Sequence, residues 1–121
     1  MGYYANGGGN IEFINPLCDD KQKRIEEILE YDGFEFEFYG SRKQNNIIIG
    51  IDIWFDNKYH GDSIEEGLNK IREIADIRDG CIEFHGEDGC HWRFLYDPPE
   101  RRWREQTGHI VYYGVNEEAI S

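Results

Sequence analysis

The sequence predicts an α+β fold in which two helices cover one face of a mainly antiparallel sheet. Three observations carry this prediction. Two stretches have apolar residues at helical spacing, residues 34–38 and 47–55 alternate between the two faces of a strand, and a helix–turn–strand pattern recurs after about 46 residues. The 121 residues fit one hydrophobic core, so we expect residues 1–121 to form a single domain.

The first expected element is a strand that ends at residues 11–14. It starts with three consecutive glycines, residues 7–9, and Asn15-Pro16 follows it. Glycine weakens a strand interior, and proline cannot donate to a ladder. We therefore predict an edge strand with a flexible or bulged start.

The first helix is expected at residues 20–31. Asp19 or Asp20 can cap its start, and Asp32-Gly33 can end it, because glycine adopts the left-handed conformation of a helix C-cap without strain. Three apolar residues share one face at helical spacing: Ile25, Ile28 and Leu29.

The second helix is expected at residues 63–77. Ser63 and Glu66 have the spacing of a capping box, and Asp79-Gly80 provides the stop signal. Its apolar face consists of Ile64, Leu68, Ile71 and either Ile74 or Ala75.

Two alternating stretches predict strands between these helices. Residues 34–38 place three phenylalanines on one face and two glutamates on the other. A polar turn at residues 40–46 leads to residues 47–55, which we expect to be the longest and most central strand. Asp52 stands in the middle of that strand, where an acidic side chain needs a partner or a cleft.

The C-terminal third predicts a hairpin and a further strand. Glu87-Asp88-Gly89 is a tight-turn sequence between strands at residues 81–86 and 92–96, and residues 97–100 turn into a strand at residues 103–113. The order βαββαβ with one or two extra C-terminal strands describes a ferredoxin-like sandwich. Such a fold hosts many functions and selects none of them.

The charge balance narrows the classes of partner. With 25 acidic and 13 basic residues the net charge is −12, which disfavours direct binding to nucleic acid because phosphates repel it. No apolar run approaches the ~20 residues that cross a membrane, and the first residues lack the pattern of a signal peptide. We therefore expect a cytoplasmic protein with no membrane partner and with reduced cysteines.

No motif for catalysis or for a cofactor emerges. The glycines at residues 7–9 lack the preceding strand and the following helix of a phosphate loop, so no nucleotide is expected there. The basic run at residues 101–104 is expected to form salt bridges with neighbouring acidic residues. We predict no cofactor and favour a protein that is not an enzyme.

The densest group of reactive residues surrounds the hairpin turn. His85 and His91 flank the turn from opposite strands, and Cys90 lies between them. The spacing lacks the paired ligands of a structural zinc site, so we expect a polar, metal-free turn where replacing either histidine changes stability by ~0.5 kcal/mol at most. The alternative is a small enzyme or ligand-binding domain whose metal site uses His85, Cys90 and His91.

The leading hypothesis is an acidic protein-binding module that occupies a basic surface of a larger protein. A small, acidic, aromatic-rich chain without catalytic signature resembles phage-encoded inhibitors of bacterial defence systems, including anti-CRISPR proteins. The resemblance implies an inhibitor of such a system, and the acidic charge suggests an inhibitor that mimics nucleic acid. A homodimer is also possible. The predicted binding residues are acidic: Glu35, Glu37, Asp52, Glu65 and Glu66.

Overall fold

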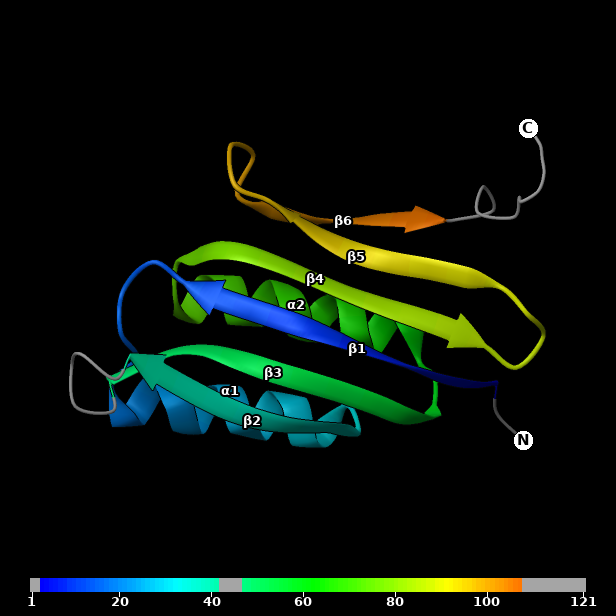
Figure 1. Cartoon of the computed structure of the whole chain (residues 1–121), viewed down its shortest axis with the longest axis horizontal. Coiled ribbons are helices and arrows are strands. Elements are labelled where there is room, and N and C mark those ends of the chain that lie inside the picture. Colours follow the sequence, from blue (N-terminus) through cyan, green and yellow to red (C-terminus); the bar gives the residue numbers. More distant parts are fainter. Residues whose placement is uncertain (1–2, 42–46, 108–121) are drawn as a thin grey trace.

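The computed structural model describes residues 3–41 and 47–107 and has an α+β architecture (Figure 1). Its elements, in chain order, are β1 (Tyr4–Phe13), α1 (Asp19–Tyr31), β2 (Phe34–Ser41), β3 (Ile47–Lys58), α2 (Gly61–Ile74), β4 (Ile77–Gly86), β5 (His91–Asp97) and β6 (Arg102–Thr107). The predicted turn at residues 42–46 and the predicted strand at residues 108–113 lie outside the described residues. Neither described helix has the length and apolar character needed to cross a membrane.

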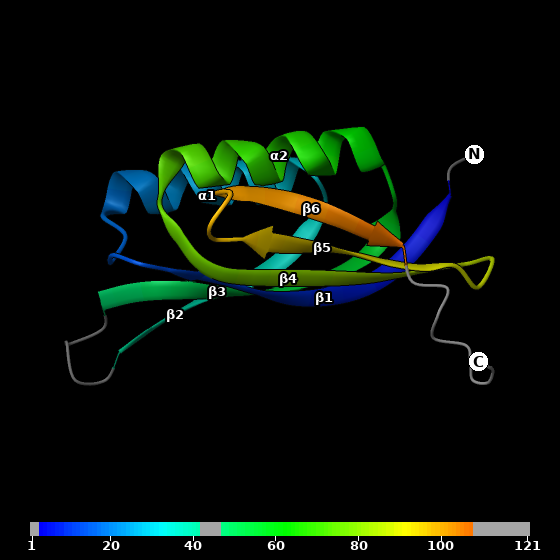
Figure 2. The ribbon, with the colours of Figure 1, turned by 90° about the horizontal axis from the view of Figure 1, so that it is seen from above.

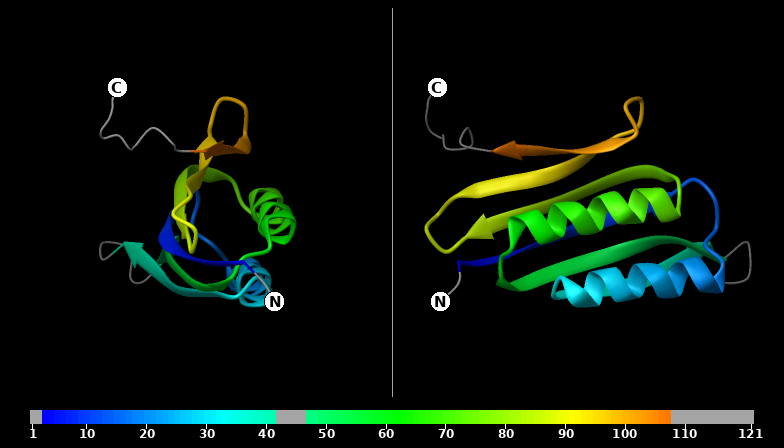
Figure 3. Two further views of the ribbon diagram at one scale, coloured as in Figure 1. Left: turned by 90° about the vertical axis from the view of Figure 1, so that its right-hand side faces the viewer. Right: turned by 180° about the vertical axis from the view of Figure 1, so that it is seen from behind.

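The six strands form one antiparallel sheet in the order β2-β3-β1-β4-β5-β6. Both helices lie on the same side of this sheet, as predicted (Figure 2). Helix α1 covers β2 and β3, and α2 covers β1 and β4, as the view from the helical side shows (Figure 3, right). The order of the six strands differs from that of a classic ferredoxin-like fold, so the α+β architecture is what the structure establishes.

Strand β1 lies inside the sheet, and its prediction as an edge strand is wrong. It pairs with β3 on one side and with β4 on the other, over almost its whole length. A Cβ atom added at Gly9 would overlap the carbonyl oxygen of Cys81 in β4, and one added at Gly7 would overlap that of Glu83. These glycines therefore allow the strands to approach closely instead of loosening the start of β1.

Strand β3 is the longest described strand, as predicted, but it lies second from the β2 edge of the sheet. The alternation is confirmed: Ile51, Ile53 and Phe55 are buried against the helices, whereas Asp52 and Trp54 are exposed on the other face. The strand was expected at the centre because of its isoleucines. The glycine-rich β1 and β4 occupy the two middle positions instead.

Both predicted helix starts are shifted. The N-cap of α1 is Cys18, and Asp19 and Asp20 lie in the first turn, where negative charge favours the helix dipole. The N-cap of α2 is His60, so Ser63 lies within the helix. The Ser63 hydroxyl donates a hydrogen bond to Oδ1 of Asp32 over 2.5 Å and forms no capping box.

The end of α2 also differs from the prediction. The helix ends at Ile74, because Ala75 is already extended, and Gly80 lies within β4. An added Cβ at Gly80 would stand 2.6 Å from Cη2 of Trp103, a residue of β6 that is only 8% exposed. Gly80 therefore makes room for this indole and is not a helix stop. With Trp103 packed there, the β6 edge of the sheet curves toward α2 (Figure 3).

The core is centred on Phe84, which has no exposed surface. Ring centroids of Tyr59, Phe55 and Trp92 lie 5.0, 5.4 and 5.7 Å from that of Phe84. The indole N–H of Trp92 donates to the Tyr59 hydroxyl over 2.8 Å, and burial raises the pKa of Tyr59 to about 12. This cluster joins β3, β4 and β5 beneath the helices, which holds the hairpin and the middle of the sheet as one unit.

Replacing Gly9 with Ala should destabilise the protein by about 3 kcal/mol or more, at the upper end of the range for overpacking, because the new methyl group meets backbone atoms that cannot rotate away. Chemical denaturation measures the change. Asn6→Ala, an exposed position on the same strand, serves as the control and should stay within ~0.5 kcal/mol. A Gly9→Ala cost below ~1 kcal/mol would contradict the close-approach role of this glycine.

Candidate functional site

The sheet has an open face, defined as the side opposite α1 and α2. No other described segment lies over it (Figure 2). Alternation along the strands and their register place the following side chains there: Glu35 and Glu37 (β2), Asp52, Trp54 and Asp56 (β3), Asn6, Asn10 and Glu12 (β1), Cys81, Glu83 and His85 (β4), His91, Arg93 and Leu95 (β5), and Arg102 and Arg104 (β6).

The half of the open face over β2, β3 and β1 is acidic, and we call it the acidic half. Lys58, at the end of β3, is the basic residue of these three strands. None of the acidic half's carboxylates forms an ion pair with a residue that the structure describes. Among the described residues, negative charge therefore accumulates there without compensation. The carboxylates are those of Glu12, Glu35, Glu37, Asp52 and Asp56.

Two of these carboxylates face each other across strands. Glu37 of β2 stands directly opposite Asp52 of β3, and both are exposed. Like charges at directly opposed positions destabilise a sheet by a fraction of a kcal/mol, up to ~1 kcal/mol. Asp52, expected to need a partner or a cleft, has neither an ion-pair partner nor a cleft in the described structure; it is exposed, with Glu37 opposite it on β2 and Asn10 opposite it on β1.

Trp54 is a large exposed aromatic residue of the acidic half, as is Tyr4 at the start of β1. Its side chain is 48% exposed, and its neighbours across the strands are Glu35 on β2 and Gly8 on β1. Since Gly8 has no side chain, one flank of the indole is uncovered. A shallow hollow of about 400 Å³ lies beside it, lined by Asn6, Gly7, Glu35, Trp54, Phe55 and Asp56.

The opposite end of the open face is basic. Arg93, Arg102 and Arg104 lie there on β5 and β6. Nε of Arg104 is 2.7 Å from Oδ2 of Asp97, and Arg101 contacts Asp76 at 3.2 Å. The salt bridges expected for the basic run are thus present, and the open face is polarised from acidic to basic along the strand order.

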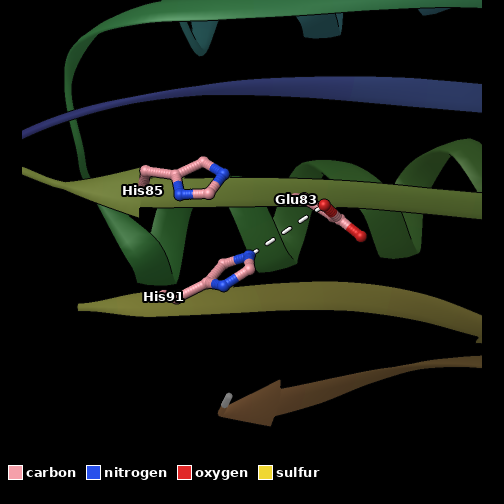
Figure 4. A group of neighbouring side chains, drawn as sticks. All are labelled: Glu83, His85 and His91. Atoms are coloured by element: carbon pink, nitrogen blue, oxygen red, sulfur yellow. Dashed lines mark ion pairs between the residues drawn. The ribbon is translucent and has the colours of Figure 1, made fainter. Parts of the chain in front are cut away.

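Between these two ends lies a cluster of Glu83, His85 and His91, with the side chains on the open face (Figure 4). His85 and His91 are paired across the β4–β5 hairpin, and their rings stack with centroids 4.2 Å apart. Nε2 of His91 is 3.9 Å from Oε1 of Glu83. One potential ligand atom from each residue lies within 4.8 Å of the others, so the cluster offers two imidazoles and a carboxylate for a metal.

Cys90, the third residue of the predicted alternative metal site, is not part of this cluster. It is exposed in the turn, and a hydrogen bond to Asp88 raises the pKa of its thiol. Glu83 takes its place because Glu83 and His85 point to the same face of β4. The sequence contained this signal, since residues two apart on a strand share a face, but the expectation considered only residues next to the turn.

The turn at residues 87–89 is exposed, as predicted, and it is tied to the start of β1. The Tyr3 hydroxyl donates to Asp88, which raises the pKa of Tyr3 to about 12 and lowers that of Asp88. Oε1 of Glu87 accepts the backbone N–H of Tyr4 over 2.6 Å. The hairpin end is therefore anchored at two points, although it is open to solvent.

The five predicted acidic binding residues do not form one surface. Glu35, Glu37 and Asp52 lie together in the acidic half, whereas Glu65 and Glu66 are exposed on α2, in the helical layer. Glu66 lines a groove of about 550 Å³ between α1 and α2. The prediction grouped these residues because all are acidic. In the structure they lie on opposite sides of the sheet.

Asp32 is a titratable group in this groove. It is the C-cap residue of α1 and accepts the Ser63 hydrogen bond, and Gly67 leaves the space that its carboxylate occupies. Burial raises the pKa of Asp32 above its ordinary value of 3.8, and the nearby Glu66 raises it further, against the lowering effect of Ser63. The folded state is therefore less stable with Asp32 ionised than with Asp32 protonated.

Comparison of the chain with protein-family models, with curated proteins and with solved structures finds no match.

Asp32→Asn should make the protein more stable than the wild type at pH 7, with a smaller difference near pH 4. Because the folded pKa is raised, the native state binds more protons than the unfolded chain between pH 3.8 and that raised value. The stability contributed by protonated Asp32 is therefore lost as the pH rises through this window. Denaturant unfolding of both proteins at the two pH values measures it, and a variant less stable than wild type at pH 7 would contradict the assignment.

Proposed function

We propose that the chain is a protein-binding module without enzymatic activity, which binds a basic surface of a larger protein through its acidic half. The observation that carries the proposal is the opposed pair Glu37 and Asp52, which has no ion-pair partner in the described part of the chain and lies next to the exposed Trp54. The repulsion between two facing carboxylates destabilises the unbound protein. A lysine or arginine of a partner, placed between them, would remove this repulsion on binding.

The acidic half contains both components that protein interfaces use. Its carboxylates would steer a basic partner during association, in a manner that depends on salt. Trp54 would serve as the anchor, since tryptophans that become fully buried on binding account for much of the affinity at such surfaces. The hollow beside Trp54 would receive a side chain of the partner.

The class of partner that fits this chemistry is a protein whose basic surface otherwise binds nucleic acid. Carboxylates spaced along neighbouring strands can occupy the sites of phosphates, and the net charge of −12 has the same sign as a nucleic acid. Binding of this kind would inhibit the partner by excluding its nucleic acid. The chain would then act as an inhibitor by mimicry.

We also propose that the domain is ferredoxin-like in topology, with β5 and β6 as additions. The order of the first four strands, β2-β3-β1-β4, and the placement of α1 and α2 on one side of the sheet support this classification. In this classification the two added strands carry the basic end of the open face, and the acidic half belongs to the four-stranded unit.

The proposal predicts that a partner binds through the acidic half. Proteins captured from a native lysate are purified, and their affinity is measured by calorimetry at several salt concentrations. The affinity should fall as the salt concentration rises. Trp54→Ala should reduce the binding free energy by about 2 kcal/mol or more, which is roughly 30-fold in Kd. A Glu37→Gln/Asp52→Asn double variant should also bind more weakly than the wild type, with the largest difference at low salt. Excess nucleic acid should displace the chain from its partner.

The matched control is a Glu65→Gln/Glu66→Gln double variant, which removes the same charge from the helical layer. It should bind as the wild type does. If this control loses binding while the Glu37→Gln/Asp52→Asn variant retains it, the contact lies on the helices and the proposal is wrong. An affinity independent of salt would contradict the electrostatic mechanism.

Glu37→Gln should also raise the stability of the free protein, by about 0.2–1 kcal/mol, because it removes one member of a like-charged cross-strand pair. Urea unfolding at low salt measures the gain, and added salt should reduce it by screening the wild-type repulsion. Equal stability of variant and wild type at low salt would show that the two carboxylates do not repel each other in the fold.

A further inference from the structure

The cluster of Glu83, His85 and His91 is assembled from two neighbouring strands on one face of the sheet (Figure 4). His85 and His91 are in direct register, and Glu83 precedes His85 by two residues, so all three side chains project from the open face. The cluster lies at the polar surface: Glu83 is 47% exposed and His91 is 26% exposed. Two imidazoles in a stacked pair therefore stand beside a carboxylate at a position that solvent can reach.

We propose that Glu83, His85 and His91 form a binding site for a divalent transition-metal ion, with Zn²⁺ as the representative ion. Two neutral imidazoles and one carboxylate are a donor set that Zn²⁺ and its neighbours in the first transition row prefer over the oxygen ligands of Mg²⁺ or Ca²⁺. Three protein ligands leave at least one coordination position for water or for a group from another molecule.

The distances in the cluster are close to those that a metal requires. Its potential ligand atoms lie within 4.8 Å of one another. In a tetrahedral zinc site with Zn–N bonds of about 2.0–2.1 Å, two ligand atoms stand roughly 3.3 Å apart. The rings of His85 and His91 are stacked 20° from parallel, so both can direct a nitrogen lone pair at one ion only if the stack opens. His85 is exposed, and its ring can turn out of the stack to bring the ligand atoms to this spacing.

The backbone that carries the two histidines is already fixed. The backbone N–H of Gly86 donates to the carbonyl of Cys90 over 2.8 Å, and the turn is anchored through Asp88 and Glu87 to the start of β1. Metal binding would therefore order only three side chains. A preformed backbone reduces the entropy that binding must overcome.

The surroundings leave the carboxylate available to a cation. Arg93 stands opposite Glu83 on β5, but its Nε donates to Oε1 of Gln106 over 2.7 Å. Within the described part of the chain, His91 is the ion-pair partner of Glu83. On the β1 side, Gly8 stands opposite Glu83, so no side chain covers the approach from there. A metal would replace a weak histidine–carboxylate contact with coordination bonds.

The test is a titration of the purified full-length chain, stripped with a chelator, with Zn²⁺ alone. We expect saturable binding of about one ion per chain, a melting temperature that rises with Zn²⁺ and returns with chelator, and shifted imidazole NMR signals for His85 and His91. Single His85→Ala and His91→Ala variants should lose more than the roughly 10- to 100-fold in affinity that removal of an outer-shell partner costs.

Three further variants separate the cluster from other ligands. Glu83→Gln should weaken Zn²⁺ binding while leaving the metal-free melting temperature unchanged, since the Glu83 side chain is half-exposed and its shape is kept. Cys90→Ser, beside the site, and His60→Gln, the exposed N-cap of α2, should bind Zn²⁺ as the wild type does. Binding that survives a His85→Ala/His91→Ala double variant, or no saturable binding by the wild type, would overturn the proposal.

The outcome is distinguishable from that of the proposed function. The Glu37→Gln/Asp52→Asn variant keeps all three metal ligands and should bind Zn²⁺ like the wild type. A failure of partner binding therefore leaves the metal site standing, and a failure of Zn²⁺ binding leaves the acidic half untouched.

Discussion

The pairing of β1 between β3 and β4 is the constraint on which the rest of the structure depends. It joins the first strand to residues far along the chain, as in the register of Ala5 with Gly86 and of Asn10 with Asp52. Without this strand the sheet would divide into a two-stranded β2–β3 unit, which is marginal in water, and a separate β4-β5-β6 unit. The glycines at residues 7–9 make the pairing possible, because side chains at Gly7 and Gly9 would meet the backbone of β4.

This pairing also explains why the open face of the sheet can carry charged residues without loss of the fold. The helices bury the face that carries Phe84 and its aromatic neighbours, and the anchored hairpin closes the end of the sheet. The fold therefore does not need apolar residues on the open face. Charged residues there cost little in packing, and opposed carboxylates such as Glu37 and Asp52 cost only the repulsion between them.

The sequence predicted which segments form helices and strands, but it did not predict where the strands lie in the sheet. Alternation around Phe36 and Ile53 and the turn at Asp88 predicted strand faces and the hairpin, because these signals are local. The place of β1 in the sheet and the role of Gly80 were misjudged, because a glycine that accommodates another strand or the indole of Trp103 looks the same in sequence as one that ends an element. Strand order depends on such long-range contacts, and no local pattern encodes them.

For the candidate sites, too, the sequence indicated the residue types but not which residues lie together. Glu37 and Asp52 were expected to act together on grounds of charge, and their direct opposition follows only from the register of β2 with β3. Glu65 and Glu66 share that charge but belong to the other layer, which composition alone could not reveal. His85 and His91 were expected to flank a turn, whereas the inclusion of Glu83 required both the strand alternation and the register to be known together.

Gly8 lies between the two surfaces for which we propose functions. In register it stands between Trp54 on β3 and Glu83 on β4, so the proposed anchor and the carboxylate of the proposed metal site are separated by one strand, about 10 Å in all. Because Gly8 has no side chain, a segment of a partner lying across the strands could reach both at once. A metal bound there would offer its open coordination position to the same partner, so the two sites, although independently testable, occupy one continuous surface.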